Sequence, residues 1–227
     1  MKKANLIALA VTSTLISTSV LSATLMVRQE HLADPSNPIN KNATLIKLGA
    51  SSGNTFFGAQ VSHKGETLST YQLGSGEVQL GHRYNVNDDI RLVPQLQVTS
   101  VTSGLLYKPQ MGFVYQLGSG FSTELKYKHE FHVRSDDKDT TQKSQYQFNL
   151  DYRIDDALRL GLQYDYFKSL DDVKQYNNHD FKQHLELKAY YRVAKGWTPF
   201  VTFAGVPVSA RSEDYQLRTR VGFLYSF

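Results

Sequence analysis

The chain has 227 residues, no cysteine and a formal net charge of +4 at neutral pH. Its mean hydropathy of −0.39 is too polar for a bundle of membrane-spanning helices, and so small a net charge gives no support for a nucleic-acid partner. A chain of this length holds one domain or two small ones.

The N-terminus has the composition of a secretory signal peptide. Lys2 and Lys3 form a basic start, residues 6–21 an apolar run, and Ser22-Ala23 a small-residue cleavage site. Because the run is short for a membrane-spanning helix, an uncleaved anchor is the less favoured interpretation. We therefore expect residues 1–23 to be removed on export and residues 24–227 to form a single barrel domain.

From residue 24 onward, short segments alternate between apolar and polar side chains, which is the period-two pattern of β-strands. Residues 144–154, for example, place Tyr146 and Phe148 on one face and Asn149 and Asp151 on the other. No segment has a convincing helical period. The sequence predicts twelve strands, at about residues 24–31, 43–51, 54–63, 76–85, 89–98, 105–116, 120–131, 144–154, 157–167, 181–193, 197–206 and 214–227.

The connections between these strands alternate in length. Tight turns are expected at residues 51–53, 85–89, 117–120, 155–156 and 194–196, and longer polar loops at residues 31–41, 63–75, 134–143, 167–180 and 206–213, with a shorter one at residues 100–104. Short turns at one end and long loops at the other are typical of outer-membrane barrels. We predict an all-β fold, a transmembrane antiparallel up-and-down β-barrel of twelve strands, in the outer membrane of a Gram-negative bacterium.

A secreted soluble β-sandwich also has alternating strands. Two features favour the membrane barrel. Nearly every strand has a charged polar face that a sandwich could not bury, and aromatic residues lie near the ends of the apolar faces, as in interfacial girdles. These aromatic residues are Tyr84, Tyr115, Phe131, Tyr152, Tyr166, Tyr191, Trp197 and Phe227.

The last strand has a wholly apolar face that ends in a terminal phenylalanine. Val221, Phe223, Tyr225 and Phe227 lie on that face, while Arg220 falls on the other. This arrangement resembles the C-terminal signal read by the outer-membrane assembly machinery. We therefore expect that machinery, outer-membrane lipid and lipopolysaccharide to be partners of the chain.

If the apolar faces meet lipid, the polar faces line the interior of the barrel. Its basic residues would be Arg28, Lys47, Arg83, Arg91, Lys108, Lys126, Lys128, Arg153, Arg159, Lys188, Arg192, Arg218 and Arg220. Its acidic residues would be Glu30, Glu77, Glu124, Glu130, Asp151, Asp165 and Glu186. Basic residues outnumber acidic ones, so positive charge is expected to concentrate inside.

Twelve strands about 4.8 Å apart and tilted by about 40° enclose a backbone cylinder roughly 24 Å wide, which side chains narrow to a bore of roughly 10 Å. A sugar ring passes such a bore. Fixed guanidinium groups concentrate anions and bind carboxylates in two-point contacts, so the sequence predicts an anion-preferring channel suited to acidic sugars. The alternative is that the cations pair with lumenal acids and brace the wall, which is the favoured reading for Arg153 beside Asp151.

The residues that carry a family resemblance are spread along the chain. They are residues 23–28 (ATLMVR), 77–84 (EVQLGHRY) followed by Asp88-Asp89 and 91–94 (RLVP), 198–201 (TPFV) and 217–222 (LRTRVG). In their order and spacing, the whole mature chain resembles the KdgM family, the oligogalacturonate-specific porins that also include the N-acetylneuraminate channel.

The resemblance implies a narrow, monomeric twelve-stranded barrel in which facing tracks of basic residues guide acidic oligosaccharides. That role carries over to Arg28, Arg83, Arg91, Arg153, Arg159, Arg192, Arg218 and Arg220, and less strongly to Lys47, Lys108, Lys126, Lys128 and Lys188. Phe200, Thr202 and Ala204, expected to face inward, depart from the acids or polar groups that relatives often carry there, so the selectivity of this chain is open.

An enzymatic barrel is not expected. A lipid-splitting barrel would need a nucleophilic serine two residues after a histidine, and none of the seven histidines has a serine at that spacing. His179 and His184 are poorly spaced for a metal, and the acid pairs at residues 136–137 and 171–172 are expected to be solvated loop charge. We expect no catalytic residue, metal or cofactor.

Two hypotheses of function follow. The first is a channel for passive uptake of acidic, uronate-type oligosaccharides, with a general small-anion porin as its less selective variant. The sequence does not distinguish galacturonate, alginate and sialate oligomers. The second is a structural or adhesion barrel whose loops bind a partner and whose pore is incidental.

Overall fold

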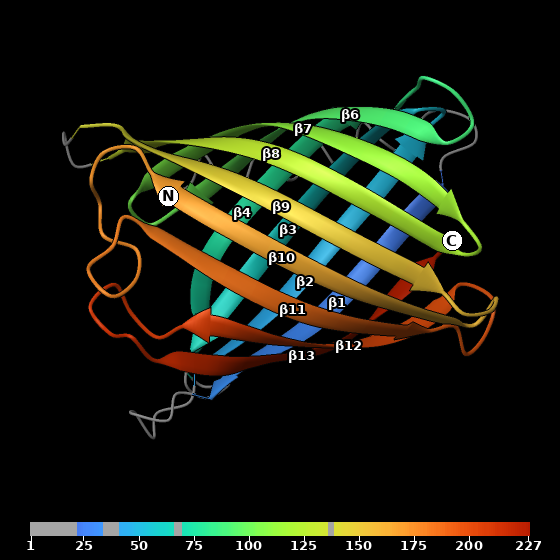
Figure 1. The fold of residues 1–227 in the computed structure, drawn as a ribbon. Helices are drawn as coiled ribbons and strands as arrows, with labels where there is room; N and C mark the ends of the chain where they lie inside the picture. Colours follow the sequence, from blue (N-terminus) through green and yellow to red (C-terminus); the bar gives the residue numbers. More distant parts are fainter. Residues whose placement is uncertain (1–21, 34–40, 66–69, 136–138) are drawn as a thin grey trace.

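The computed structural model describes residues 22–33, 41–65, 70–135 and 139–227. Within these residues the chain forms one antiparallel sheet that curls into a closed barrel (Figure 1). Its strands are β1 (Ser22–Ala33), β2 (Lys41–Ser52), β3 (Thr55–Gly65), β4 (Gln72–His82), β5 (Tyr84–Asn85), β6 (Ile90–Val101), β7 (Gly104–Gly118), β8 (Phe121–Arg134), β9 (Thr141–Arg153), β10 (Leu158–Ser169), β11 (Phe181–Tyr191), β12 (Trp197–Pro207) and β13 (Tyr215–Ser226).

Each strand pairs with its neighbours in the sequence, and the sheet closes where the first and last strands meet. β13 pairs with β1, placing Arg220 opposite Glu30. β4 pairs with β6, and the two-residue β5 continues β4 beyond Arg83 along the same partner. Twelve strands therefore cross the barrel, and the predicted fold is confirmed.

Every predicted strand overlaps an observed one, but several boundaries differ. At one end of the barrel the strands extend into segments expected to be loop, since β8 continues to Arg134 and β9 begins at Thr141. Polar side chains do not prevent pairing there, because the ladder is made by backbone groups. The first turn falls at Gly53, since residues 51 and 52 still belong to β2.

The two ends of the barrel differ in their connections. Tight turns join the strands at the end where the C-terminus lies, at the right of Figure 1, and the connections at the other end are longer, apart from the two-residue turn between β6 and β7. We call these the turn end and the loop end. In the β9–β10 turn, Oδ1 of Asp155 accepts hydrogen bonds from the backbone N of Leu158 and of Ala157, both at 2.7 Å. These bonds hold the pKa of the Asp155 carboxyl below its usual range.

The expected signal peptide lies almost entirely outside the described residues. Of residues 1–23, the structure describes Ser22 and Ala23, which open β1. Among the described residues, no helix is both long and apolar enough to cross a membrane.

At the loop end, two connections are bound to each other. The backbone N of Asn177, between β10 and β11, donates to the carbonyl of Ser212, between β12 and β13, at 3.2 Å. The Asn178 backbone N donates to the Ala210 carbonyl at 2.9 Å. These two loops therefore form a single rim beside the mouth of the barrel.

The apolar faces of the strands point outward and the polar faces inward. Leu125 and Leu187, for example, are 56% and 57% exposed on the outer surface. The buried side chains are mostly polar: Ser62, Thr99, Gln110, Ser144, Asn149, Asp165, Ser169, Glu186, Thr202 and Gln216. The interior of the barrel is thus a polar wall, as a water-filled pore requires.

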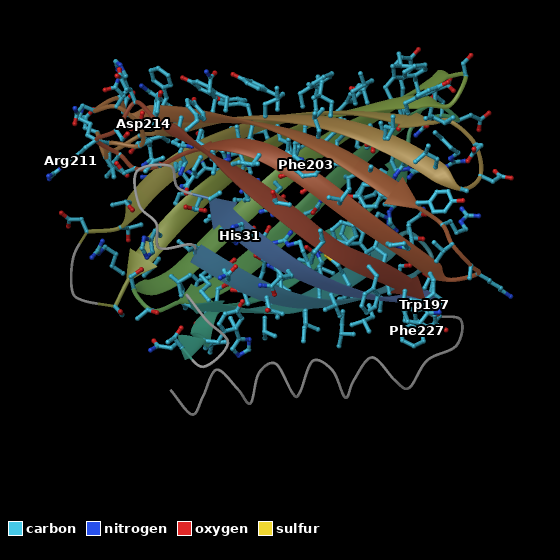
Figure 2. The ribbon with its side chains drawn as sticks, turned by 90° about the horizontal axis from the view of Figure 1, so that it is seen from below. His31, Trp197, Phe203, Arg211, Asp214 and Phe227 are labelled. Carbon is cyan, nitrogen blue, oxygen red and sulfur yellow. The ribbon has the colours of Figure 1, made fainter. Side chains whose placement is uncertain are left out.

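Aromatic side chains gather on the outer surface near both ends. At the turn end, Trp197 packs against Tyr225 with ring centroids 4.8 Å apart, and Figure 2 shows Trp197 and Phe227 both at this end of the barrel. At the loop end, Tyr166 and Phe181 stack at 5.8 Å. Together they form the two girdles predicted from the sequence.

Gly222 is a tight point where β13 meets β1. A Cβ there would collide with the carbonyl oxygen of Val27 and lie 2.8 Å from Cζ of Phe200. We expect Gly222→Ala to lower the free energy of unfolding by about 2 kcal/mol, measured by urea titration of the barrel in lipid vesicles. Gly205→Ala is the matched control, because its Cβ would meet only Tyr215 Cδ1 at 3.8 Å. Equal destabilisation of the two variants would contradict this packing argument.

Candidate functional site

The inward-facing residues of the twelve strands form a continuous surface, which we call the lumenal wall. The register places on it Arg28 (β1), Lys47 (β2), Arg91 (β6), Lys108 (β7), Lys126 and Lys128 (β8), Arg153 (β9), Arg159 (β10), Lys188 (β11), and Arg218 and Arg220 (β13). Arg83 and Arg192 follow the last residues of β4 and β11, at the turn end. The acids Glu30, Glu77, Glu124, Glu130, Asp151, Asp165 and Glu186 share the same wall.

Three arginines and two glutamates form an arginine cluster on β1, β11 and β13: Arg28, Glu30, Glu186, Arg218 and Arg220. Oε2 of Glu186 accepts hydrogen bonds from Nη2 of Arg218 at 2.6 Å and from Nη1 of Arg220 at 2.9 Å. Oε2 of Glu30 accepts from Nε of Arg220 at 2.6 Å and lies 3.9 Å from Nη2 of Arg28. Because three guanidinium groups share two carboxylates, the cluster keeps a net positive charge.

The hydrogen bonding of this cluster is incomplete. Nε of Arg28 and Nε of Arg218 are buried and have no hydrogen-bond partner among the described residues. Buried donors normally have a partner, so an additional acceptor, such as water or an anion, would complete the bonding here.

β12 lies between β11 and β13, yet Glu186 and Arg218 pair across it. Ala204 is the register neighbour of both residues, and Ala204 and Thr202 are 2% and 3% exposed. Two strand spacings amount to about 10 Å, which the two long side chains cover when the residues between them are short. Phe200, Thr202 and Ala204 therefore face inward as predicted, and the small residues among them make room for the ion pair.

A second group of ion pairs lies on β7, β8 and β9. Oε1 of Glu130 is 2.8 Å from Nζ of Lys143, and its Oε2 is 3.5 Å from Nζ of Lys108. Oε1 of Glu124 is 3.1 Å from Nζ of Lys126. Here too, three cations share two acids.

Other lumenal cations have no acidic partner. Nζ of Lys47 donates to Oε1 of Gln79 at 3.1 Å, and Nζ of Lys188 donates to Oε1 of Gln163 at 2.5 Å. In the described part of the chain, the basic residues on or next to the wall without an ion pair include Lys47, Lys128, Lys182, Lys188, Arg83, Arg91, Arg153 and Arg192.

The expected pairing of Arg153 with Asp151 is wrong. Arg153 is the exposed last residue of β9, whereas Nε of Arg159 on β10 lies 3.9 Å from Oδ1 of Asp151. Asp151 lies opposite Gly161, which has no side chain, so the diagonal neighbour Arg159 can approach it.

Among the inward residues that were not predicted from the sequence as parts of the pore are Lys143, Phe167 and Lys182. Lys182 is in phase with His184 and could have been found by extending that alternation. Lys143 lies one residue before the predicted strand, so no face could be assigned to it. Phe167 is apolar at a lumenal position, where polarity alone suggests the opposite face.

The structure also bears on the acid pairs and the histidines that the sequence assigned to loops. The acid pair at residues 136–137 lies outside the described residues. Asp171 is not simply solvated, because its Oδ2 accepts a hydrogen bond from the backbone N of Gln142. His179 stacks on Phe181 at 5.2 Å while the His184 ring lies 5.0 Å from Phe167, and the described residues contain no group of three metal-ligating side chains.

A family model and several known proteins match most of the chain. The family model described as oligogalacturonate-specific porin protein (KdgM) matches residues 16–227. The oligogalacturonate-specific porin KdgM of Dickeya dadantii is 26% identical over 237 residues, covering 99% of this chain and 100% of the relative. The uncharacterized protein YiiY of Salmonella typhimurium is 24% identical over 226 residues, covering 94% of each.

Solved structures have the same fold. The NanC porin matches with a TM-score of 0.78 at 12% identity, covering 89% of this chain and 100% of that chain. The KdgM porin matches with a TM-score of 0.67 at 20% identity, covering 90% and 99%. One structure of the KdgM porin is a complex with disordered oligogalacturonate.

Proposed function

The chain belongs to the family of oligogalacturonate-specific porins (KdgM), and from that premise we propose that its pore takes up acidic, uronate-type oligosaccharides, guided by the basic residues of the lumenal wall. Family membership and the twelve-stranded barrel make the protein an outer-membrane channel of a Gram-negative bacterium. The KdgM relative is a porin, which accords with a channel rather than an enzyme.

The observation that carries the proposal is the excess of cations on the lumenal wall. Lys47, Lys128 and Lys188 lie within β2, β8 and β11, and within the described residues none of the three has an acid within ion-pair distance. The arginine cluster adds three guanidinium groups for two carboxylates. In a narrow bore, fixed positive charges raise the local concentration of anions.

An acidic oligosaccharide fits such a wall better than a single small anion does. A chain with one carboxylate per sugar ring can exchange one cation for the next, so that each contact is weak and several act together. The complex of the related KdgM porin with oligogalacturonate supports this class of solute.

Reversing the charge of two lumenal lysines that have no ion pair is expected to remove the preference of the pore for acidic sugars. In Lys128→Glu with Lys188→Glu, permeation of trigalacturonate should fall about tenfold, because the reversed charges repel the carboxylates instead of attracting them. Osmotic swelling of proteoliposomes in trigalacturonate, compared with a neutral trisaccharide, measures the effect. The wild type should admit the acidic sugar faster, and the variant should lose that difference while its neutral flux is unchanged.

Lys195→Glu, in the β11–β12 turn, is the control for an altered net charge outside the wall, and it should keep the wild-type preference. Equal wild-type rates for the acidic and the neutral trisaccharide would contradict the proposal and favour a general or incidental pore.

A further inference from the structure

We propose that Phe167 is a stacking platform for a pyranose ring at the loop end of the lumen, so that the pore recognises the face of the sugar as well as its carboxylate. This inference rests on the proposed function, because it names a second chemical feature of the same class of solute.

The register places Phe167 inside the barrel. It lies opposite Lys182 on β11 and opposite Gln145 on β9, and both neighbours belong to the lumenal wall. Two residues further along β10 the strand ends at Ser169, so Phe167 lies near the loop end. An outside solute therefore meets this ring in the outer part of the pore.

Basic groups surround the ring of Phe167. Nζ of Lys182 lies 5.3 Å from its centroid, Nζ of Lys143 lies 5.8 Å from it, and the His184 ring centroid is 5.0 Å away. Lys143 is bound to Glu130 at 2.8 Å, whereas Lys182 forms no ion pair within the described part of the chain. Lys182 thus remains available for a carboxylate beside the ring.

This combination matches the two chemical features of a uronate sugar. One face of a pyranose ring presents several C–H groups with slight positive charge, which are attracted to the negative face of an aromatic ring. The carboxylate projects from the edge of the same sugar, where an ammonium group can bind it. Phe167 is half-buried, and the ammonium groups of Lys182 and Lys143 lie over its ring, so a sugar reaches the ring face as these flexible side chains turn aside toward its carboxylate.

A related arrangement occurs further along the same wall. Cζ of Arg159 lies 4.3 Å from the centroid of the Tyr190 ring, and Tyr190 packs against Phe200 at 5.5 Å. Arg159 is the second residue of β10, near the turn end. Aromatic rings next to cations therefore occur at both ends of the path that passes the arginine cluster.

The test compares two trianions. Trigalacturonate has sugar rings, whereas citrate is acyclic. The measured quantity is the concentration of each that halves the ion current through the channel in planar bilayers. For Phe167→Leu, we expect this concentration to rise about fivefold for trigalacturonate and to stay unchanged for citrate. Phe167→Trp keeps an aromatic face and should retain tight block by trigalacturonate.

Phe181→Leu is the matched control, because Phe181 is an aromatic residue at the same end of the barrel but on its outer surface. It should leave both blocking concentrations unchanged. Equal weakening of both trianions in Phe167→Leu would overturn the inference, since the ring would then act only by holding the lysines. The inference would also be overturned if Phe167→Leu left the blocking concentrations of both trianions unchanged. It would be overturned as well if trigalacturonate blocked Phe167→Trp as weakly as Phe167→Leu. A wild-type channel that trigalacturonate does not block would instead refute the proposed function, before any variant is compared.

Discussion

Replacing Arg218 and Arg220 together by serine is expected to abolish the anion preference of the pore and to cut uptake of acidic oligosaccharides by about tenfold or more. The change removes two of the three guanidinium groups of the arginine cluster and leaves Glu186 and Glu30 with Arg28 as the remaining cation of the cluster. The cluster therefore changes from net positive to net negative. Growth on an acidic oligosaccharide as sole carbon source, together with ion selectivity in planar bilayers, measures the two effects.

Lysine substitutions separate charge from geometry at these positions. Arg218→Lys with Arg220→Lys keeps the charge but loses the planar fork that binds a carboxylate at two points. We expect this variant to stay anion-selective and to bind acidic oligosaccharides less tightly than the wild type. If the barrel were structural or adhesive, the serine variant would keep its function and shortening the loop at residues 170–180 would abolish it. Wild-type uptake by the serine variant would thus contradict the proposed role of the cluster.

Glu186→Gln is expected to have the opposite effect on selectivity. Glu186 is 4% exposed and binds both Arg218 and Arg220, so neutralising it frees the Arg218 guanidinium for the solute and leaves Arg220 paired with Glu30. We expect anion selectivity to rise several-fold and block by trigalacturonate to become tighter. The free energy of unfolding should fall by about 2 kcal/mol, because the arginines lose their shared carboxylate.

The matched control is Glu213→Gln, which removes one acid from the exposed β12–β13 loop. It should change neither selectivity nor stability. A Glu186→Gln channel that is less anion-selective than the wild type would show that Glu186 acts by positioning the arginines rather than by masking their charge.

The fold was predictable because one physical constraint acts on every strand. A strand that separates lipid from water must alternate, so residues 144–154 alone reveal their two faces. The turn residues Asp155 and Gly53 mark where strands end, since they favour backbone conformations outside strands. Strand ends at the loop end were predicted less well, because pairing there continues through polar residues such as Lys143.

The faces of the pore could be assigned from the sequence, whereas the partners within it could not. The alternation of apolar and polar residues indicates that Glu186 and Arg218 both point inward. Their pairing could not be predicted, because it spans the intervening strand and requires a short residue, Ala204, between the two long side chains. Arg159, rather than Arg153, reaches Asp151 because Gly161 leaves space, which only the register reveals. Phe167 was missed because an apolar residue in a water-filled lumen breaks the rule by which faces were assigned.

The most direct test is the reversal potential of the wild-type channel in a planar bilayer under a tenfold gradient of potassium chloride. We predict the sign of an anion-selective pore, with chloride more permeant than potassium. The selectivity should weaken at high salt, because the Debye length falls from about 10 Å at 0.1 M to about 3 Å at 1 M, and the wall charges are then screened across the bore. A reversal potential of the opposite sign would contradict the claim that the lumenal cations select the solute.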